Sequence, residues 1–156
     1  MADDPSTSAC PIVNDATAAS DLMQRVFQRL VWLDEGLQAR LHNRGWPDVS
    51  RAQSMVMINV TGGIRRPADI ARQVGVSRQA VHVTINQMVA LGILRLADDP
   101  SDGRYKVVEL TAFGENMRHD AQEALGEMTR ALVDRIGADR LAALVDAMRA
   151  DWGPSY

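Results

Sequence analysis

Apolar residues recur every three or four positions in two long stretches near the ends of the chain, which is the pattern of amphipathic helices. The first stretch runs from Asp21 to about Asn43, and its apolar stripe is Leu22, Val26, Leu30, Leu33, Leu37 and Leu41. The second runs from Thr111 to about Ile136, with the stripe Phe113, Met117, Ala121, Leu125, Met128, Leu132 and Ile136, and a short helix follows Gly137. Each apolar stripe must be buried, either against the core of this chain or against a second copy of the chain.

Three shorter helices are predicted between these two. Ser50 and Gln53 have the spacing of a capping box, and Gly62-Gly63 marks the end of the helix that they begin. We expect this helix to be largely buried through Met55, Val56, Ile58 and Val60.

The next two helices are joined by a very short connection. Pro67 suits the first position of one helix, Gly75 allows a tight turn, and Ser77 caps a second helix that stops at Gly92. Ala71 leaves room for the close crossing of the two helices. This spacing predicts a helix-turn-helix whose second helix turns Val81, Ile85 and Met88 toward the core.

Two short strands, 93–96 and 106–110, are predicted immediately afterwards, with a turn-rich loop over 98–104. The predicted fold class is therefore mainly α: a winged helix-turn-helix with a two-stranded β-wing, flanked by long N- and C-terminal helices. We expect a disordered arm over 1–19, dimerisation helices over 20–46 and 111–156, and the winged module over 47–110, all in one intertwined domain.

The charge of the chain is unevenly distributed along its length. The 156 residues carry a net charge of −3. Residues 61–110 hold seven basic and five acidic side chains, a balance of 7 − 5 = +2, so the remainder carries −5. The basic middle agrees with a nucleic-acid partner, although such a segment is common by chance.

Several classes of protein are disfavoured by composition and motifs. The single cysteine, Cys10, excludes an intrachain disulfide and a cysteine-based zinc site. No apolar run is long enough for a membrane helix and no secretory signal is recognisable, so we expect a cytoplasmic protein. The three histidines match no metal spacing and no catalytic motif is present, so we expect no enzyme, metal or cofactor.

The second helix of the helix-turn-helix has a polar face suited to DNA bases. With Val81 inward, the face away from the core presents Gln79, Val83 and Asn86, with Ser77 and Arg78 at the N-terminal end and His82 at the margin. Gln and Asn can each form two hydrogen bonds with adenine, and Val83 can touch a thymine methyl group. An ordinary solvated helix face is the alternative.

The wing adds a second candidate contact with DNA. Arg104 follows a turn, and Asp102 is near enough to hold its guanidinium group. An arginine at a wing tip can enter the minor groove. Lys106, Arg65 and Arg66 are candidate phosphate contacts.

These residues resemble the MarR-type winged helix-turn-helix regulators. The resemblance rests on residues 69–71, 75–82 and Gly92, and above all on Asp99-Pro100-x-Asp102-Gly103-Arg104 followed by Val108-x-Leu110-Thr111-x-x-Gly114. Val83 replaces a basic residue of many members, and Ser101 replaces the first arginine of a common wing pattern. Cys10 lies in an acidic arm without a neighbouring base, which disfavours the redox sensing of one family branch.

The resemblance implies a homodimer that reads a pseudo-palindromic operator and binds a small, often aromatic or phenolic effector in a crevice. The corresponding pocket residues are Trp32, His42, Met55 and Met117, for which core packing is the alternative. We therefore expect a sequence-specific dimeric transcriptional regulator, most often a repressor that the effector releases. The alternative is a winged-helix protein-interaction module without specific DNA binding.

Overall fold

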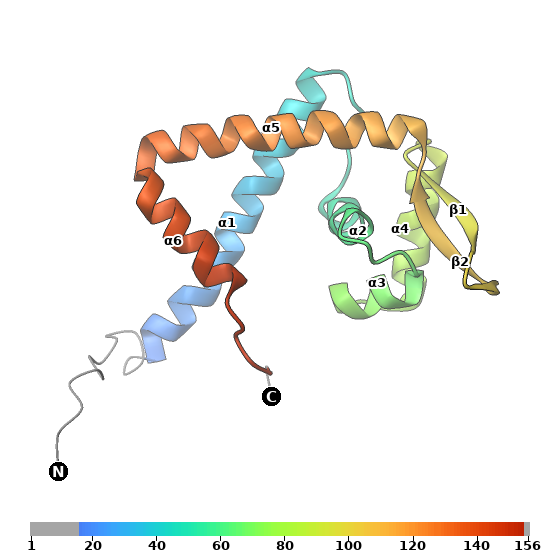
Figure 1. The fold of residues 1–156 in the computed structure, drawn as a ribbon, viewed down its shortest axis with the longest axis horizontal. Coiled ribbons are helices and arrows are strands. Elements are labelled where there is room, and N and C mark those ends of the chain that lie inside the picture. The colour runs from blue at the N-terminus through green and yellow to red at the C-terminus, as the bar shows by residue number, and fades with distance from the viewer. Residues whose placement is uncertain (1–15, 155–156) are drawn as a thin grey trace, which may run out of the picture. The chain divides into compact units, whose positions relative to one another are not determined.

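The computed structural model describes residues 16–154, with side chains from residue 20 onward (Figure 1). This part of the chain contains six helices and one two-stranded sheet, and it divides into two compact units between Gly36 and Leu37. The elements are α1 (Ala16–Asn43), α2 (Arg51–Thr61), α3 (Pro67–Val74), α4 (Arg78–Ala90), β1 (Leu94–Asp99), β2 (Asp102–Leu110), α5 (Ala112–Ile136) and α6 (Ala138–Arg149). This architecture confirms the predicted fold class of a winged helix with a β-wing.

Helix α1 begins at Ala16, five residues before the predicted start. Residues 16–19 of the predicted arm are therefore helical, whereas residues 1–15, including Cys10, lie outside the described residues. Arg25 Nε donates a hydrogen bond to Asp21 Oδ2 at 2.5 Å across one helical turn, which supports the first exposed turns.

The core of the second unit forms where α2, α3, α4 and the hairpin meet. Ile70, Val81, Ile85, Met88, Ile93, Leu94 and Val108 are among its fully buried residues. The expectation for Ile58 was wrong, because its side chain is 57% exposed. Val56 and Val60 lie four residues apart on the inner face of α2, and Ile58, two residues from each, falls on the opposite face.

The helix-turn-helix connection follows the predicted chemistry. Gly75 adopts φ +74°, a left-handed conformation in which the N–H groups of Gly75 and Val76 both reach the carbonyl oxygen of Ala71. Ser77 Oγ accepts a hydrogen bond from the Ala80 N–H at 3.1 Å and caps α4. At α2, the predicted capping box between Ser50 and Gln53 is present in both directions.

The wing is a longer and tighter hairpin than predicted. The strands pair antiparallel from Leu94↔Leu110 to Asp98↔Lys106, and after an irregularity Asp99 lies opposite Asp102. The predicted loop over 98–104 is therefore reduced to the turn at Pro100 and Ser101. Polar side chains extend the ladder here, so the hydrophobic pattern alone did not reveal these strand ends.

Helix α5 leaves the wing directly. Thr111 caps it by accepting a hydrogen bond from the Gly114 N–H. Trp46, in the connection between α1 and α2, packs edge-on against Phe113 with ring centroids 5.0 Å apart and donates to Asp120 Oδ2 at 2.7 Å. Helix α6 has no buried residue. In the described part of the chain, no helix combines the length and apolar character that a membrane span requires.

Candidate nucleic-acid interface

Helix α4 presents a polar face with uncommitted side chains. Arg78, Gln79, His82, Val83 and Asn86 are all exposed, whereas Val81, Ile85 and Met88 on the opposite face are at most 2% exposed. Within residues 16–154, the five exposed side chains form no hydrogen bond or ion pair. The donors and acceptors of this face are therefore free to meet a ligand.

Ser77 stands apart from this group. Its hydroxyl oxygen already accepts the capping hydrogen bond from the Ala80 N–H. The hydroxyl hydrogen and a second lone pair remain for another partner. Its structural contribution is to fix the N-terminal end of α4.

The wing holds an arginine in a defined orientation. Arg104 donates from Nε to Asp102 Oδ1 at 3.0 Å and from Nη2 to Asp102 Oδ2 at 2.8 Å. The Arg104 side chain is nevertheless 84% exposed. The Arg104 side chain and its backbone N–H lower the pKa of Asp102, and Asp102 in turn raises the pKa of Arg104. The result is a protruding cation with a fixed guanidinium plane.

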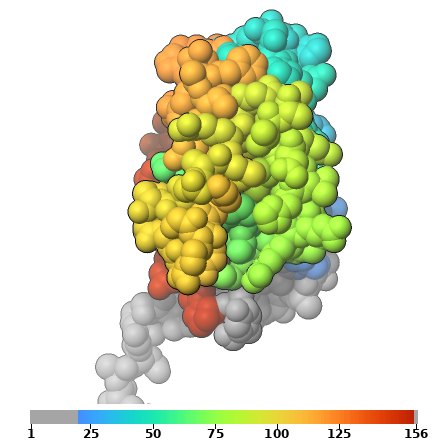
Figure 2. All heavy atoms as spheres, turned by 90° about the vertical axis from the view of Figure 1, so that its right-hand side faces the viewer, coloured from blue at the N-terminus to red at the C-terminus, as the bar shows by residue number. Residues whose placement is uncertain are grey.

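Helix α4 and the wing lie side by side on one face of the second unit (Figure 2). The helix with the free polar groups and the hairpin that carries Arg104 are thus neighbours. This surface is the candidate nucleic-acid interface that the sequence predicted.

The predicted phosphate contacts are less free than the sequence suggested. Lys106 Nζ lies 2.5 Å from Asp98 Oδ1, in agreement with their pairing across the hairpin. Arg65 Nη1 lies 4.0 Å from Glu109 Oε1, and Glu109 also accepts a hydrogen bond from Arg95 at 2.6 Å. These exposed pairs cost little to break, so they leave a phosphate role open.

Arg66 differs from the other two because it binds a buried carboxylate. The Asp99 side chain is only 7% exposed and accepts a hydrogen bond from Arg66 Nε at 2.7 Å. The side chain and backbone of Ser101, together with Arg66, lower the pKa of Asp99 to about 2. Sequence reasoning missed this cluster, although Asp99-Pro100-x-Asp102 gave a signal, since an aspartate before a turn often binds the backbone two residues later.

The predicted effector-pocket residues have dissimilar environments. Met117 belongs to the core and is 3% exposed, and Met55 is half-buried on α2. His42 is exposed and its Nδ1 lies 2.8 Å from Asp48 Oδ1, whereas Trp32 is 40% exposed on α1. These positions leave the pocket a prediction.

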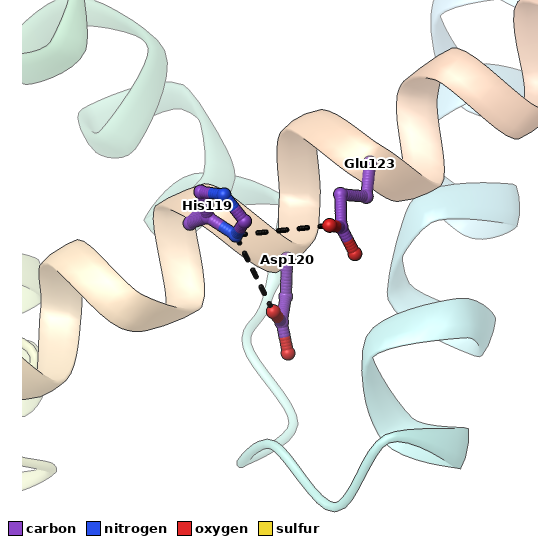
Figure 3. A group of neighbouring side chains, drawn as sticks. All are labelled: His119, Asp120 and Glu123. Carbon is purple, nitrogen blue, oxygen red and sulfur yellow. Dashed lines mark ion pairs between the residues drawn. The ribbon is translucent and has the colours of Figure 1, made fainter.

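One further polar group lies on α5, where His119, Asp120 and Glu123 gather (Figure 3). His119 Nδ1 is 3.9 Å from one oxygen of each carboxylate. The other oxygens are already used, because Trp46 binds Asp120 Oδ2 and Arg44 binds Glu123 Oε2 at 3.1 Å. We interpret the group as part of the contacts that hold the α1–α2 connection against α5.

The fold and the α4–wing surface define a winged helix-turn-helix protein. Comparison with known proteins finds a family model that matches part of the chain: residues 48–104 match the model of the MarR family. Over this segment, which holds the helix-turn-helix and the turn of the wing, the chain is similar to that family. No curated protein sequence matches the chain significantly.

Solved structures are similar to this chain at the level of the fold. A cysteine-to-serine mutant of MarR from Escherichia coli, complexed with operator DNA, shows a TM-score of 0.63 at 20% identity and covers 86% of this chain and 96% of its own. The transcriptional regulator Tm0710 from Thermotoga maritima gives 0.57 at 18% identity, with coverage of 83% and 90%. BldR from Sulfolobus solfataricus gives 0.59 at 18% identity, with coverage of 83% and 93%.

Proposed function

We propose that this protein is a sequence-specific DNA-binding transcriptional regulator. The observation that carries the proposal is that α4, whose exposed polar side chains are free, lies beside the wing, whose Arg104 is 84% exposed. Gln79 and Asn86 have the amide groups that recognise adenine edges, and Val83, 51% exposed, suits a thymine methyl group. The operator complex of the Escherichia coli relative supports this assignment.

The protein acts as a homodimer in this proposal. Leu22, Val26, Leu30 and Leu33 are 37–49% exposed along α1, and Leu144, Val145 and Met148 are 37–50% exposed on α6. Two symmetric copies would place their α4 helices about 34–36 Å apart, one turn of DNA. The operator is then a pseudo-palindrome with half-sites about ten base pairs apart.

Regulation is by repression in this proposal, because a dimer on a promoter blocks polymerase. A small effector, aromatic or phenolic as in many family members, releases the DNA. It must bind more tightly to a dimer whose α4 helices have the wrong spacing, since a ligand shifts a conformational equilibrium only by its differential affinity. Trp32, His42, Met55 and Met117 remain the predicted pocket residues.

The first experiment is a DNA-binding titration over a series of salt concentrations. The DNA upstream of the protein's own gene is compared with random DNA of the same length. We expect preference for the upstream DNA and a steep fall of affinity with salt, because basic side chains displace counterions from phosphates. Equal and weak binding to both DNAs would contradict the choice of operator, and binding to neither at low salt would contradict the function.

Arg104→Ala tests the role of the wing. We expect about tenfold weaker binding and a smaller salt dependence, because one cation leaves the interface. The matched control is Arg149→Ala on α6, whose side chain is 77% exposed. Affinity that falls equally in both variants would reduce the effect to net charge and remove the wing from the interface.

A protein-interaction module is the second candidate, favoured by the exposed Val83 and the net charge of −3. In that case the same surface binds a protein, and DNA affinity shows no salt-dependent sequence preference. The titration over salt therefore separates the two functions.

A further inference from the structure

The wing is attached to the start of α3 at two points. The Val108 N–H on β2 donates to the carbonyl oxygen of Arg65 at 2.9 Å, outside the two-stranded sheet. The next residue, Arg66, is the N-cap of α3, and its side chain crosses to Asp99 at the end of β1. A two-stranded hairpin alone is marginally stable in water. The position of this wing therefore depends on such attachments.

Both oxygens of Asp99 are engaged. Oδ1 accepts hydrogen bonds from the Ser101 N–H at 2.9 Å and from the Ser101 hydroxyl at 2.6 Å, which closes the turn. Oδ2 accepts from Arg66 Nε at 2.7 Å, and Arg66 Nη2 lies 2.5 Å from the same oxygen. One carboxylate thus joins the wing turn to the N-terminal end of α3.

The rest of the Arg66 guanidinium group also contacts the hairpin. Nη2 lies 3.3 Å from Ser101 Oγ, and the central carbon lies 5.1 Å from the centroid of the Tyr105 ring. The distance to the ring is within the range of a cation–π contact. Arg66 therefore binds both strands of the wing, through Asp99 on β1 and Tyr105 on β2.

A phosphate contact would compete with this arrangement. If Arg66 turned to DNA, the carboxylate of Asp99, which is 7% exposed with Arg66 in place, would lose its cation and keep only the hydrogen bonds from Ser101. Separating Arg66 from this shielded carboxylate costs more free energy than breaking the exposed Lys106–Asp98 pair.

We propose that Arg66 is a positioning residue, which sets the wing and with it Arg104 through Asp99, and that it does not act as a phosphate contact. The proposal rests on the proposed DNA-binding function for its effect on affinity. Its mechanical part, the attachment of the wing to α3, is independent of any ligand.

The decisive test uses two neighbouring aspartates. Asp99→Asn and Asp98→Asn each remove one negative charge from the same hairpin, so electrostatics alone predicts equal or tighter DNA binding for both. The positioning role predicts about tenfold weaker binding for Asp99→Asn, because Arg104 loses its placement, and no weakening for Asp98→Asn. Unchanged or tighter binding by Asp99→Asn would overturn the proposal.

Substitution of Arg66 distinguishes a positioning role from a phosphate contact. Lysine keeps the charge but lacks the planar fork that reaches Asp99 and stacks on Tyr105. We expect Arg66→Lys to bind DNA about tenfold more weakly than the native protein and to have a smaller salt slope, as Arg104→Ala does, because Arg104 leaves the interface in both variants. Near-native affinity of Arg66→Lys would identify a phosphate contact instead, because lysine keeps the charge that such a contact needs.

Hydrogen exchange of the wing provides a readout without DNA. The Val108 amide, bonded to Arg65, should exchange faster in Arg66→Lys and Asp99→Asn than in Asp98→Asn, while amides of the α4 core keep their protection. If native protein fails to bind DNA but this exchange pattern holds, the proposed function fails and the positioning role stands. Equal Val108 protection in all three variants would overturn the positioning role.

Discussion

The winged module and the terminal helices have the same kind of apolar periodicity but opposite burial. In the module, Val81, Ile85 and Met88 on α4 are at most 2% exposed. On α1, Val26 and Leu30, also four residues apart, are 39% and 37% exposed. Helix α6 has no buried residue at all.

The difference shows what hydrophobic periodicity establishes. It identifies the face of a helix that prefers to be buried, and leaves open what covers that face. The module covers its own faces with α2, α3, α4 and the hairpin, whereas apolar side chains of α1 and α6 remain exposed in the single chain. An exposed apolar stripe is what the proposed dimer interface requires. Mutations should therefore change folding in the module and association in the terminal helices.

The largest expected effect comes from a glycine at the junction of the module and α5. A Cβ atom at Gly114 would lie 2.1 Å from the carbonyl oxygen of Ile93 and 3.0 Å from Leu110 Cδ2. The backbone must move to accommodate this Cβ atom. Gly114→Ala should therefore lower the free energy of unfolding by about 3 kcal/mol. Thermal and urea unfolding measure the change.

Gly126, farther along the same helix, is the matched control. A Cβ atom there meets only Arg130 Nη1, at 3.6 Å. Gly126→Ala should stabilise the protein by about 1 kcal/mol, the ordinary gain in a helix interior. Equal effects of the two alanines would mean that the module is no more tightly packed than the outer part of α5.

The next effect concerns association through the α1 stripe. Val26→Ser should weaken self-association by about 1 kcal/mol in each copy, roughly 30-fold in the dissociation constant of a dimer, because an apolar contact is lost twice. Sedimentation velocity over a range of concentrations measures it. Ile58→Ser on α2, where the native side chain is 57% exposed, is the control and should leave association unchanged. A dimer equally stable in both variants would exclude this stripe from the interface.

The same comparison explains which parts of the structure the sequence predicted. Periodicity, caps and the Gly75 turn predicted the helices of the module, because local chemistry and the buried face agree there. Ile58 was wrongly predicted to be buried because a run of apolar residues does not reveal which of them face the core. The role of Arg66 was missed because its partner Asp99 lies 33 residues away and becomes buried only when the hairpin folds against α3. The base-reading role of the α4 residues and the ligand-binding role of the pocket residues remain predictions, since exposure and packing do not show what a side chain binds.

The smallest expected effect is the pH dependence contributed by Asp99. Its pKa falls from 3.8 to about 2 on folding, chiefly through the hydrogen bonds from Ser101 and then that from Arg66. A lowered folded-state pKa stabilises the protein above the unfolded pKa, and this contribution is lost as the pH falls from about 4 to about 2. The difference in unfolding free energy between native protein and Asp99→Asn should therefore be constant above about pH 5 and shrink below about pH 4, as urea titrations at several pH values would measure. A difference that stays constant down to about pH 2 would show that folding against the wing turn does not lower the pKa of Asp99.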